Sequence, residues 1–343
     1  MTRVLLIANC QSYQVGNFFA RALYNLGIAY DDVDEGRLVE AYLRSLVCKL
    51  LYKVLKRPIS YRWFQSRIID AARSFRPSMV LVTKGAWIAP DTLCEVKALT
   101  GATLVNYATD DPFNPKTTTR DLIAGIPLYD LYVCTKRAIT EDVRRAGCRN
   151  VVYVPFGYEP SLHFPELPTT EKECLRFASD LCFIGGADRD RFPVLRRVAE
   201  LPGINLHLYG GYWQRDPMLR PFHRGFAYGR DYRLAMSGTR IALCLVRRAN
   251  RDGHVMRTFE IPACSAFMLA ERTEEHLSFF EEDKEMVCFG SDDELVDKVR
   301  YYLAHDEERQ QIAQAGHRRV WAERYTYRDR LQEILAHVEG LCQ

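Results

Sequence analysis

The chain has 343 residues, of which 48% are hydrophobic and 27% are charged. This length exceeds what one hydrophobic core usually takes up and suits two domains, and the composition argues against a disordered or membrane-embedded protein. The formal net charge is only +3 with both signs interspersed, which argues against a nucleic-acid binder that works through bulk positive charge.

The chain begins with a short apolar run, Val4–Ala8, which is too short for the hydrophobic region of a signal peptide and indicates a first strand. No stretch approaches the ~18 apolar residues of a spanning helix. The eleven cysteines include no C-x-x-C pair, which indicates reduced thiols rather than disulfides or a zinc site. We therefore expect a cytoplasmic protein with no metal site and no cofactor.

Short, unalternating runs rich in Val, Ile and Leu recur along the chain and predict strands that are buried on both faces of parallel sheets. The runs in the first half are Val4–Ala8, Met79–Thr83, Thr103–Tyr107, Leu131–Cys134 and Val151–Pro155, and those in the second are Leu181–Ile184, Leu206–Tyr209, Ile241–Val246, Phe267–Leu269 and Met286–Phe289. Between them, the proline-rich stretch Gly157–Ser179 predicts a linker. We expect two α/β domains, at residues 1–165 and 166–343.

The last part of the chain predicts helices, because apolar residues recur there at spacings of three and four. The predicted helices are Asp292–His305, Glu307–Arg324 and Arg328–Glu339. Ser291 and Glu294 have the spacing of a capping box at the start of the first helix.

In open parallel sheets, ligands bind at the carboxyl ends of strands, so the loops after the predicted strands are candidate sites. Gly16 follows the first strand without a G-x-G-x-x-G motif. It is a candidate for close approach of the backbone to a ligand, and a plain turn that caps a helix is the alternative. Asp110 and Asp111 follow the strand at Thr103–Tyr107 as candidate general bases or acceptor ligands, with an ordinary Asp-Asp-Pro turn as the alternative.

Two loops of the second half offer groups for a nucleotide. Arg191 follows the strand that ends at Ile184, and its fixed fork of donors suits a diphosphate, although the Asp/Arg alternation around it also suits solvated ion pairs. Tyr209 ends the next strand and offers a ring for a nucleobase, with a core position as the alternative.

The most informative segment is Leu245–Cys264, in which a buried strand leads through a polar loop into a helix. Gly253 and His254 lie in the loop, and a helix beginning near His254 would direct free amides at a bound phosphate. Pro262 predicts a kink or an early stop of this helix.

Charged side chains flank the same loop. Arg257 and Glu260 are three residues apart and share a helix face, which would place a cation for phosphate beside a carboxylate for sugar hydroxyls. A plain intrahelical ion pair is the alternative. We expect Arg257, together with Arg247 or Arg191, to neutralise a departing diphosphate.

The run Arg257–Leu269, followed by Tyr301-Tyr302-Leu303 and Tyr325-Thr326-Tyr327, resembles the spore-maturation CgeB-like branch of group 1 glycosyltransferases. The resemblance is strongest from Asp231 to Leu335. It implies a GT-B fold, with two Rossmann-like domains that face each other across a cleft and a helical C-terminal segment. It also implies acceptor binding by the N-terminal half and donor binding by the C-terminal half.

The wider superfamily of retaining enzymes has two glutamates separated by seven residues. Glu260 matches the second, which contacts the donor ribose, while Asp252 stands at the first, near the transferred sugar. Ser265 replaces the usual glycine after the Ala-Cys pair. These two departures leave open whether the reaction retains or inverts the anomeric configuration.

We therefore expect a glycosyltransferase that moves a sugar from a nucleotide-sugar donor to a hydroxyl-bearing acceptor without a metal. Such an enzyme works mainly by positioning and electrostatics. The acceptor is a glycan, a lipid-linked molecule or a small molecule. The alternatives are a nucleotide-sugar epimerase or hydrolase on the same fold and a catalytically inactive nucleotide-sugar-binding protein.

The segment Leu38–Arg67 predicts an amphipathic helix with a basic face. Such a helix can make peripheral contact with an anionic membrane. The preferred interpretation is that it packs its apolar stripe on the sheet.

Overall fold

The computed structural model describes residues 2–36, 46, 50, 54 and 61–341. The chain forms two compact units, each built on a parallel sheet. The first unit comprises Met1–Pro155, Ala249–Arg251 and Tyr327–Gln343, and the second comprises Phe156–Arg248 and Asp252–Thr326. The predicted division at residue 165 differs from this one in two respects, since the chain leaves the first unit at Pro155 and its last helix returns to it.

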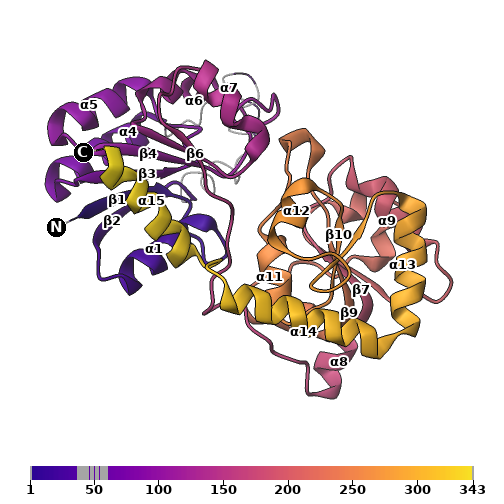
Figure 1. The fold of residues 1–343 in the computed structure, drawn as a ribbon. Helices are drawn as coiled ribbons and strands as arrows, with labels where there is room; N and C mark the ends of the chain where they lie inside the picture. The colour runs from indigo at the N-terminus through magenta and orange to yellow at the C-terminus, as the bar shows by residue number, and fades with distance from the viewer. Residues whose placement is uncertain (1, 37–45, 47–49, 51–53, 55–60, 342–343) are drawn as a thin grey trace. The chain divides into compact units, whose positions relative to one another are not determined.

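The first unit has a six-stranded sheet of order β2-β1-β3-β4-β5-β6, in which all neighbours run parallel (Figure 1). Its strands are β1 Arg3–Ala8, β2 Ala29–Asp34, β3 Met79–Thr83, β4 Thr103–Ala108, β5 Leu131–Cys134 and β6 Val151–Tyr153. Its helices are α1 Val15–Asn25, α4 Tyr61–Phe75, α5 Pro90–Thr100, α6 Arg120–Gly125, α7 Thr140–Arg145 and α15 Tyr327–Leu341.

The five predicted strands of this half are confirmed, and β2 is the strand that the sequence did not reveal. Its sequence, AYDDVD, has almost no apolar run, because β2 is an edge strand whose Asp31 and Asp32 are exposed. The helix α15 packs on α1, where the buried ring of Tyr327 lies 5.0 Å from that of Phe18 and 5.5 Å from that of Phe19. This aromatic packing explains why the end of the chain belongs to the first unit.

The second unit has a five-stranded parallel sheet of order β11-β10-β9-β7-β8. Its strands are β7 Ser179–Ile184, β8 Leu206–Tyr209, β9 Thr239–Cys244, β10 Met268–Glu271 and β11 Val287–Phe289, and all five were predicted. Its helices are α8 Glu171–Phe177, α9 Arg191–Ala199, α10 Arg230–Gly238, α11 Arg257–Ala263, α12 Glu274–Phe279, α13 Asp292–Ala304 and α14 Asp306–Ala322.

Two helix starts differ from expectation. The predicted linker contains α8, which begins with a full capping box between Thr170 and Glu173. At α13, the Ser291 hydroxyl accepts the Glu294 N–H as predicted, but the Glu294 carboxylate accepts from the N–H of Gly290 at 2.7 Å rather than from that of Ser291. The Glu294 carboxylate therefore binds the N–H of the residue before the N-cap Ser291, instead of the N–H of Ser291 itself.

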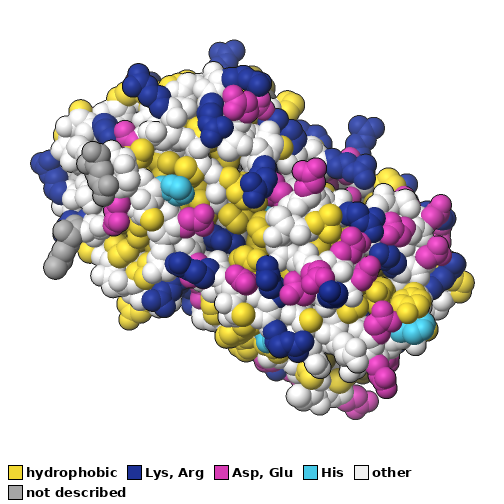
Figure 2. Space-filling model, viewed as in Figure 1, with side chains coloured by type: hydrophobic (Ala, Val, Ile, Leu, Met, Phe, Trp, Pro, Cys, Tyr) yellow, Lys and Arg dark blue, Asp and Glu magenta, His cyan; other side chains and the backbone are white. Residues whose placement is uncertain are grey.

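Basic and acidic side chains are interspersed on the face seen in Figure 2, in keeping with the small net charge. Among the described helices, none is both long and apolar enough to cross a bilayer. The predicted basic helix at Leu38–Arg67 lies mostly outside the described residues. Its described positions Leu46, Leu50 and Val54 are exposed, and its end forms the start of α4.

Candidate functional site

The loops after β7 and β9 form a polar region at the carboxyl ends of these strands in the second unit. Arg191, the first residue of α9, joins these loops, because its Nη1 donates to the Gly186 carbonyl at 3.0 Å and its Nη2 to the Leu245 carbonyl at 3.1 Å. Its side chain is 9% exposed. Arg191 therefore fixes the two loops from inside rather than presenting its charge to solvent.

Arg191, Arg247 and Arg257 lie close enough for their charges to act on one another. Burial, together with the positive charges of Arg247 and Arg257, lowers the pKa of Arg191 to about 10, against the opposing charges of Asp188 and Asp252. A group of guanidinium ions at the carboxyl ends of parallel strands is the arrangement expected around a bound anion.

Arg247 and Arg257 are the more accessible members, with side-chain exposures of 36% and 27%. The Nε of Arg247 lies 3.2 Å from Oδ2 of Asp188. Burial raises the pKa of that carboxyl, but the Arg189 N–H and the Arg247 guanidinium outweigh burial and lower it overall. The Nε of Arg257 donates to the Ile184 carbonyl at 3.1 Å, which directs the side chain toward the end of β7.

The helix that carries Arg257 is shorter than predicted. It begins at Arg257 instead of near His254 and has seven residues, so an anion site on its own amides is not supported. The early stop predicted from Pro262 is confirmed, since α11 ends at Ala263. Ser265 follows with a φ of +57°, a left-handed conformation that favours glycine. The glycine that the resemblance leads us to expect at this position would adopt the same conformation without strain.

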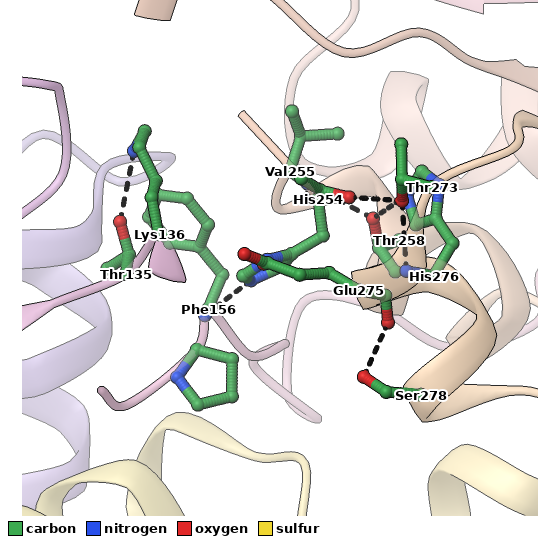
Figure 3. A network of polar contacts seen from close by, with 12 residues as sticks. Thr135, Lys136, Phe156, His254, Val255, Thr258, Thr273, Glu275, His276 and Ser278 are labelled. Carbon is green, nitrogen blue, oxygen red and sulfur yellow. Dashed lines mark hydrogen bonds and ion pairs between the residues drawn. The ribbon is translucent and has the colours of Figure 1, made fainter. Parts of the chain in front are cut away.

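The loop between Arg247 and α11 is held by the start of α12 (Figure 3). The Thr273 hydroxyl donates to the Gly253 carbonyl at 2.5 Å, and the Asp252 N–H donates to the Arg247 carbonyl at 3.3 Å. A Cβ on Gly253 would lie 2.5 Å from Cδ of Glu275. A residue with a Cβ fits here only if the Glu275 side chain, which packs directly on the backbone, moves away.

His254, which the sequence predicted as a donor contact, is completely buried in this structure. Its Nε2 accepts the Phe156 N–H at 3.0 Å, and its Nδ1 is hydrogen-bonded to the Glu275 carboxylate. An acceptor at Nε2 requires the proton to be on Nδ1, so these two partners define a neutral ring. His254 is therefore a positioning residue that anchors the polar loop.

A second buried histidine continues this network. The ring of His276 has its Nε2 2.9 Å from the Thr258 hydroxyl and its Nδ1 2.7 Å from the Glu271 carbonyl. Burial lowers the pKa of His276 to about 4, so this ring is also neutral at physiological pH. The network ties α11 and α12 to the end of β10.

Glu260 is also more enclosed than predicted, with 3% exposure. Its Oε2 accepts from the Tyr232 hydroxyl at 2.9 Å and lies 3.7 Å from Nε of Arg257. Its Oε1 lies 3.7 Å from Nε2 of His163. These contacts indicate that Glu260 orients Arg257 from inside the unit. This agrees with the alternative given above, in which Arg257 and Glu260 form an intrahelical ion pair.

Tyr209 occupies a core position, the alternative considered for it, and does not offer its ring to a base. Its side chain is 1% exposed and its hydroxyl donates to the Arg176 carbonyl at 3.2 Å. Exposed aromatic side chains lie instead in the following loop, at Tyr212, Phe226 and Tyr228, with exposures of 54%, 55% and 45%.

The rings of Phe226 and Tyr228 are stacked, with centroids 5.7 Å apart and an interplanar angle of 20°. A Cβ on Gly211 would lie 3.8 Å from the Phe226 ring, and the Gly211 carbonyl accepts the Ala187 N–H at 2.9 Å. The stacked pair therefore adjoins the loop after β7. Sequence reasoning missed it, because isolated aromatics in a proline-rich loop carry no periodic signal.

The three remaining predicted residues belong to the first unit. Asp110 pairs with Lys84 at 2.8 Å. Asp111 is buried, and its Oδ2 accepts from Nε of Arg251 at 2.7 Å while its N–H donates to Asn250. Asp111 thus holds the segment Ala249–Arg251, and this ion pair does not favour its use as a general base.

Gly16 has a packing role in the first unit. A Cβ there would overlap the carbonyl oxygen of Asn9. The glycine lets α1 approach the end of β1 closely, so the structural alternative accounts for it. Among the described residues, no group of three or more His, Cys, Asp or Glu side chains has the arrangement of a metal site.

Residues 191–336, which include Arg191, Arg247 and Arg257, match the family model described as Glycosyl transferase-like. No curated protein matches the chain in sequence. Solved structures do match, over nearly the whole chain.

Anabaena HepE in complex with UDP-glucose has 12% identity and a TM-score of 0.66, covering 99% of this chain and 100% of its own. Sucrose-phosphate synthase from Thermosynechococcus elongatus has 11% identity and a TM-score of 0.67 and covers 100% of both chains. A Listeria monocytogenes protein described as a UDP-N-acetylglucosamine 2-epimerase has 11% identity and a TM-score of 0.58, with 98% and 96% covered. At such identities the likeness establishes the fold, and the family match comes from residues 191–336, most of which lie in the second unit. The chain has the GT-B fold, and its residues 191–336 match the family described as Glycosyl transferase-like.

Proposed function

We propose that the second unit binds a nucleotide-sugar and that its sugar is transferred to a hydroxyl group of an acceptor. The observation that carries this proposal is the convergence of Arg191, Arg247 and Arg257 at the ends of β7 and β9. A nucleoside diphosphate leaves with negative charge, and guanidinium groups stabilise such charge where it develops. HepE, which shares the fold, holds UDP and UDP-glucose in its crystal structures.

In the reaction, the bond between the anomeric carbon and the phosphate oxygen breaks, and its electron pair leaves with the nucleoside diphosphate. The acceptor oxygen forms the new bond and loses its proton. Arg247 and Arg257 would stabilise the departing diphosphate, while Arg191 and Glu260 keep the loops and Arg257 in place. Since arginines supply this charge, we expect transfer to continue in EDTA.

We assign the nucleoside to the stacked pair of Phe226 and Tyr228. Every nucleobase has a π-face, and stacking on an aromatic side chain is worth about 1–3 kcal/mol per base in single-stranded nucleic-acid complexes. The pair is exposed and adjoins the loop of Gly186, whose carbonyl is bound by Arg191. Tyr212 has a φ of +75° and is the third exposed ring of this loop region.

Asp252 remains our candidate for a contact with the transferred sugar, based on its position eight residues before Glu260. The anomeric configuration of the product, read by NMR, decides between retention and inversion. Membership of the CgeB-like branch, a cytoplasmic location and an acceptor that is a glycan, a lipid-linked molecule or a small molecule are further parts of the proposal.

A thermal-shift screen of nucleotide-sugars followed by product analysis tests the proposal. A ligand at 100 times its Kd should add about 2.7 kcal/mol of apparent stability. We expect a nucleotide-sugar to shift the Tm and its sugar to appear on an added acceptor. A converted sugar nucleotide without transfer would support the epimerase alternative, to which the Listeria structure lends a fold precedent. Binding without any turnover would support an inactive binding protein.

A further inference from the structure

The polar loop between β9 and α11 leaves the second unit for three residues and then returns to it. Arg248 and Asp252 are part of the second unit, whereas Ala249–Arg251 between them is part of the first. Asn250 is 3% exposed, so this short segment is packed into the first unit instead of extending into solvent. Asp252 and Gly253, which follow it directly, are the loop residues that we associate with the donor.

Arg251 is held in the first unit by two carboxylates. Its Nε donates to Oδ2 of Asp111 at 2.7 Å and its Nη2 to Oδ1 of the same residue at 3.1 Å, which is the two-pronged geometry of a strong arginine–carboxylate pair. Its Nη1 donates to Oδ2 of Asp142 at 2.6 Å and to the Ala138 carbonyl at 3.3 Å. Three of its nitrogen atoms are thus bound to the first unit.

The turn that carries Asp111 is itself fixed. Its N–H donates to Oδ1 of Asn250 at 2.8 Å, and its Oδ1 also accepts the Phe113 N–H at 2.9 Å. The completely buried Lys136 donates from Nζ to the Thr109 carbonyl, two residues before Asp111, at 3.0 Å. The support under Arg251 is therefore built from buried, hydrogen-bonded groups, unlike an exposed surface ion pair.

The backbone of Arg251 requires such a support. Its φ is +50°, a left-handed conformation that residues other than glycine adopt only where surrounding contacts hold them in it. The other end of the loop is fixed as well, by the Thr273 hydroxyl on the Gly253 carbonyl and by the buried ring of His254. Only Asp252 and Gly253 lie between Arg251 and His254, so their conformation depends on both anchors.

We propose that Arg251 is a positioning residue, which through its ion pairs with Asp111 and Asp142 holds Asp252 and Gly253 in the conformation that receives the sugar part of the donor. A loop ordered before binding does not have to be ordered by the ligand, which strengthens binding. The proposal rests on the proposed function in one respect, since Asp252 is its candidate contact to the transferred sugar. It gives two carboxylates of the first unit a share in donor binding, through the continuity of the chain.

The comparison of Arg251→Ala with Arg251→Gly tests the proposal. Both variants lose the guanidinium, but glycine adopts a positive φ without strain and alanine does not. A loop that is in its competent conformation for about a tenth of the time binds about ten-fold more weakly. We therefore expect Arg251→Ala to bind UDP-glucose about ten-fold or more weakly than the wild type, Arg251→Gly to lose less, and both losses to be smaller for UDP, which lacks the sugar. Isothermal titration measures these affinities, and the thermal-shift screen replaces the two probes if it favours another base.

Hydrogen exchange of the ligand-free protein, followed by mass spectrometry, reads the loop without any nucleotide. Peptides that cover residues 246–256 should exchange faster in Arg251→Ala than in the wild type, and peptides that cover β11 should not change. Asp142→Asn is a milder variant, because it leaves the pair with Asp111 in place, and it should show the same changes to a smaller extent. Arg145→Ala is the matched control, because Arg145 is 72% exposed and pairs with the same Asp142 at 3.3 Å.

Equal affinity of Arg251→Ala and the wild type for the nucleotide-sugar would overturn the proposal. Equal losses in the alanine and glycine variants would also overturn it, because the charge of Arg251 and not its backbone would then matter. Unchanged exchange of residues 246–256 in Arg251→Ala would contradict it whether or not a nucleotide binds. If the wild type bound no nucleotide-sugar of the screen, the proposed function would fail, while faster exchange in Arg251→Ala would still support the anchoring of the loop.

Discussion

Arg257 donates a hydrogen bond from Nε to the carbonyl of Ile184 at 3.1 Å, so the first residue of α11 is fixed to the last residue of β7. On its other side the same Nε lies 3.7 Å from the buried Glu260 carboxylate. A cation held between a strand end and a buried carboxylate is preorganised, and preorganised charge is the main means by which such an enzyme stabilises a leaving group. The predictions below test this arrangement and the loops around it.

The first prediction concerns the aromatic pair. Phe226→Ala should weaken binding of UDP about ten-fold or more, because a base loses its stacking surface, and should leave binding of inorganic pyrophosphate unchanged. Isothermal titration of the two ligands measures both effects.

The control for Phe226→Ala is Tyr301→Ala, which removes a ring of similar exposure, 46%, from α13 in the same unit. If UDP bound equally well to Phe226→Ala, Tyr301→Ala and the wild type, the assignment of the base to the Phe226–Tyr228 pair would be wrong.

The second prediction concerns the loop anchor. Glu275→Ala removes the acceptor of the His254 Nδ1–H and leaves a buried donor unpaired, which should lower the free energy of unfolding by about 1–3 kcal/mol. The released loop should also weaken donor binding. Urea unfolding and titration with UDP on the same samples measure the two effects.

Glu274→Ala is the matched control for this change, because Glu274 is the exposed neighbour on the same helix. Glu275→Gln should restore much of the lost stability, since its amide oxygen can accept the same hydrogen bond. A Glu275→Ala variant as stable as the control would show that the His254 contact does not support the loop.

The third prediction uses the raised pKa of Glu35. The folded value is about 7 against 4.5 for the free side chain, so the folded state holds this proton more tightly than the unfolded state. The stability associated with the protonated carboxyl is therefore present below pH 4.5 and is lost as the pH rises to 7. At ~1.4 kcal/mol per pKa unit, the loss is roughly 3 kcal/mol.

Glu35→Gln does not titrate, so it should be about as stable as the wild type at pH 4.5 and more stable at pH 8. Urea unfolding at both pH values checks this, with Asp31→Asn as the control. The charged and titratable groups around Glu35 are Asp34, Lys84, Cys10 and Tyr129. An advantage of Glu35→Gln that is the same at both pH values would show that the carboxyl does not titrate in this range.

The strands of both sheets could be predicted from the sequence, because a strand buried on both faces must be an unbroken apolar run. The edge strand β2 could not, since Asp31 and Asp32 break that run where one side meets solvent. The candidate site, too, could be predicted only in part. The loops after β7 and β9 were identified by their position, whereas the internal roles of His254 and Glu260 depend on partners distant in sequence.

Pairings between distant residues explain the remaining misses. Asp111 and Arg251 are 140 positions apart, and nothing local to either predicts their ion pair. The sequence pointed to Gly253 as a loop residue near a bound phosphate. The structure adds a packing reason for this glycine, because the Glu275 side chain occupies the space that a Cβ would need. At Ser265 the structure shows a left-handed backbone, which the residue type alone does not predict.

The most direct test of the account is the affinity of Arg247→Ala and Arg257→Ala for UDP and for uridine, measured by isothermal titration. If the thermal-shift screen favours a nucleotide-sugar with another base, the corresponding nucleoside diphosphate and nucleoside take the place of UDP and uridine. Arg248→Ala is the control, because Arg248 is a neighbouring arginine whose side chain is 75% exposed. The account predicts that the two variants lose roughly 10- to 100-fold in UDP affinity, as expected for hydrogen bonds to a charged group, while uridine binding and the control are unchanged. UDP affinity equal to that of the wild type in both variants would contradict the assignment of the diphosphate to this site.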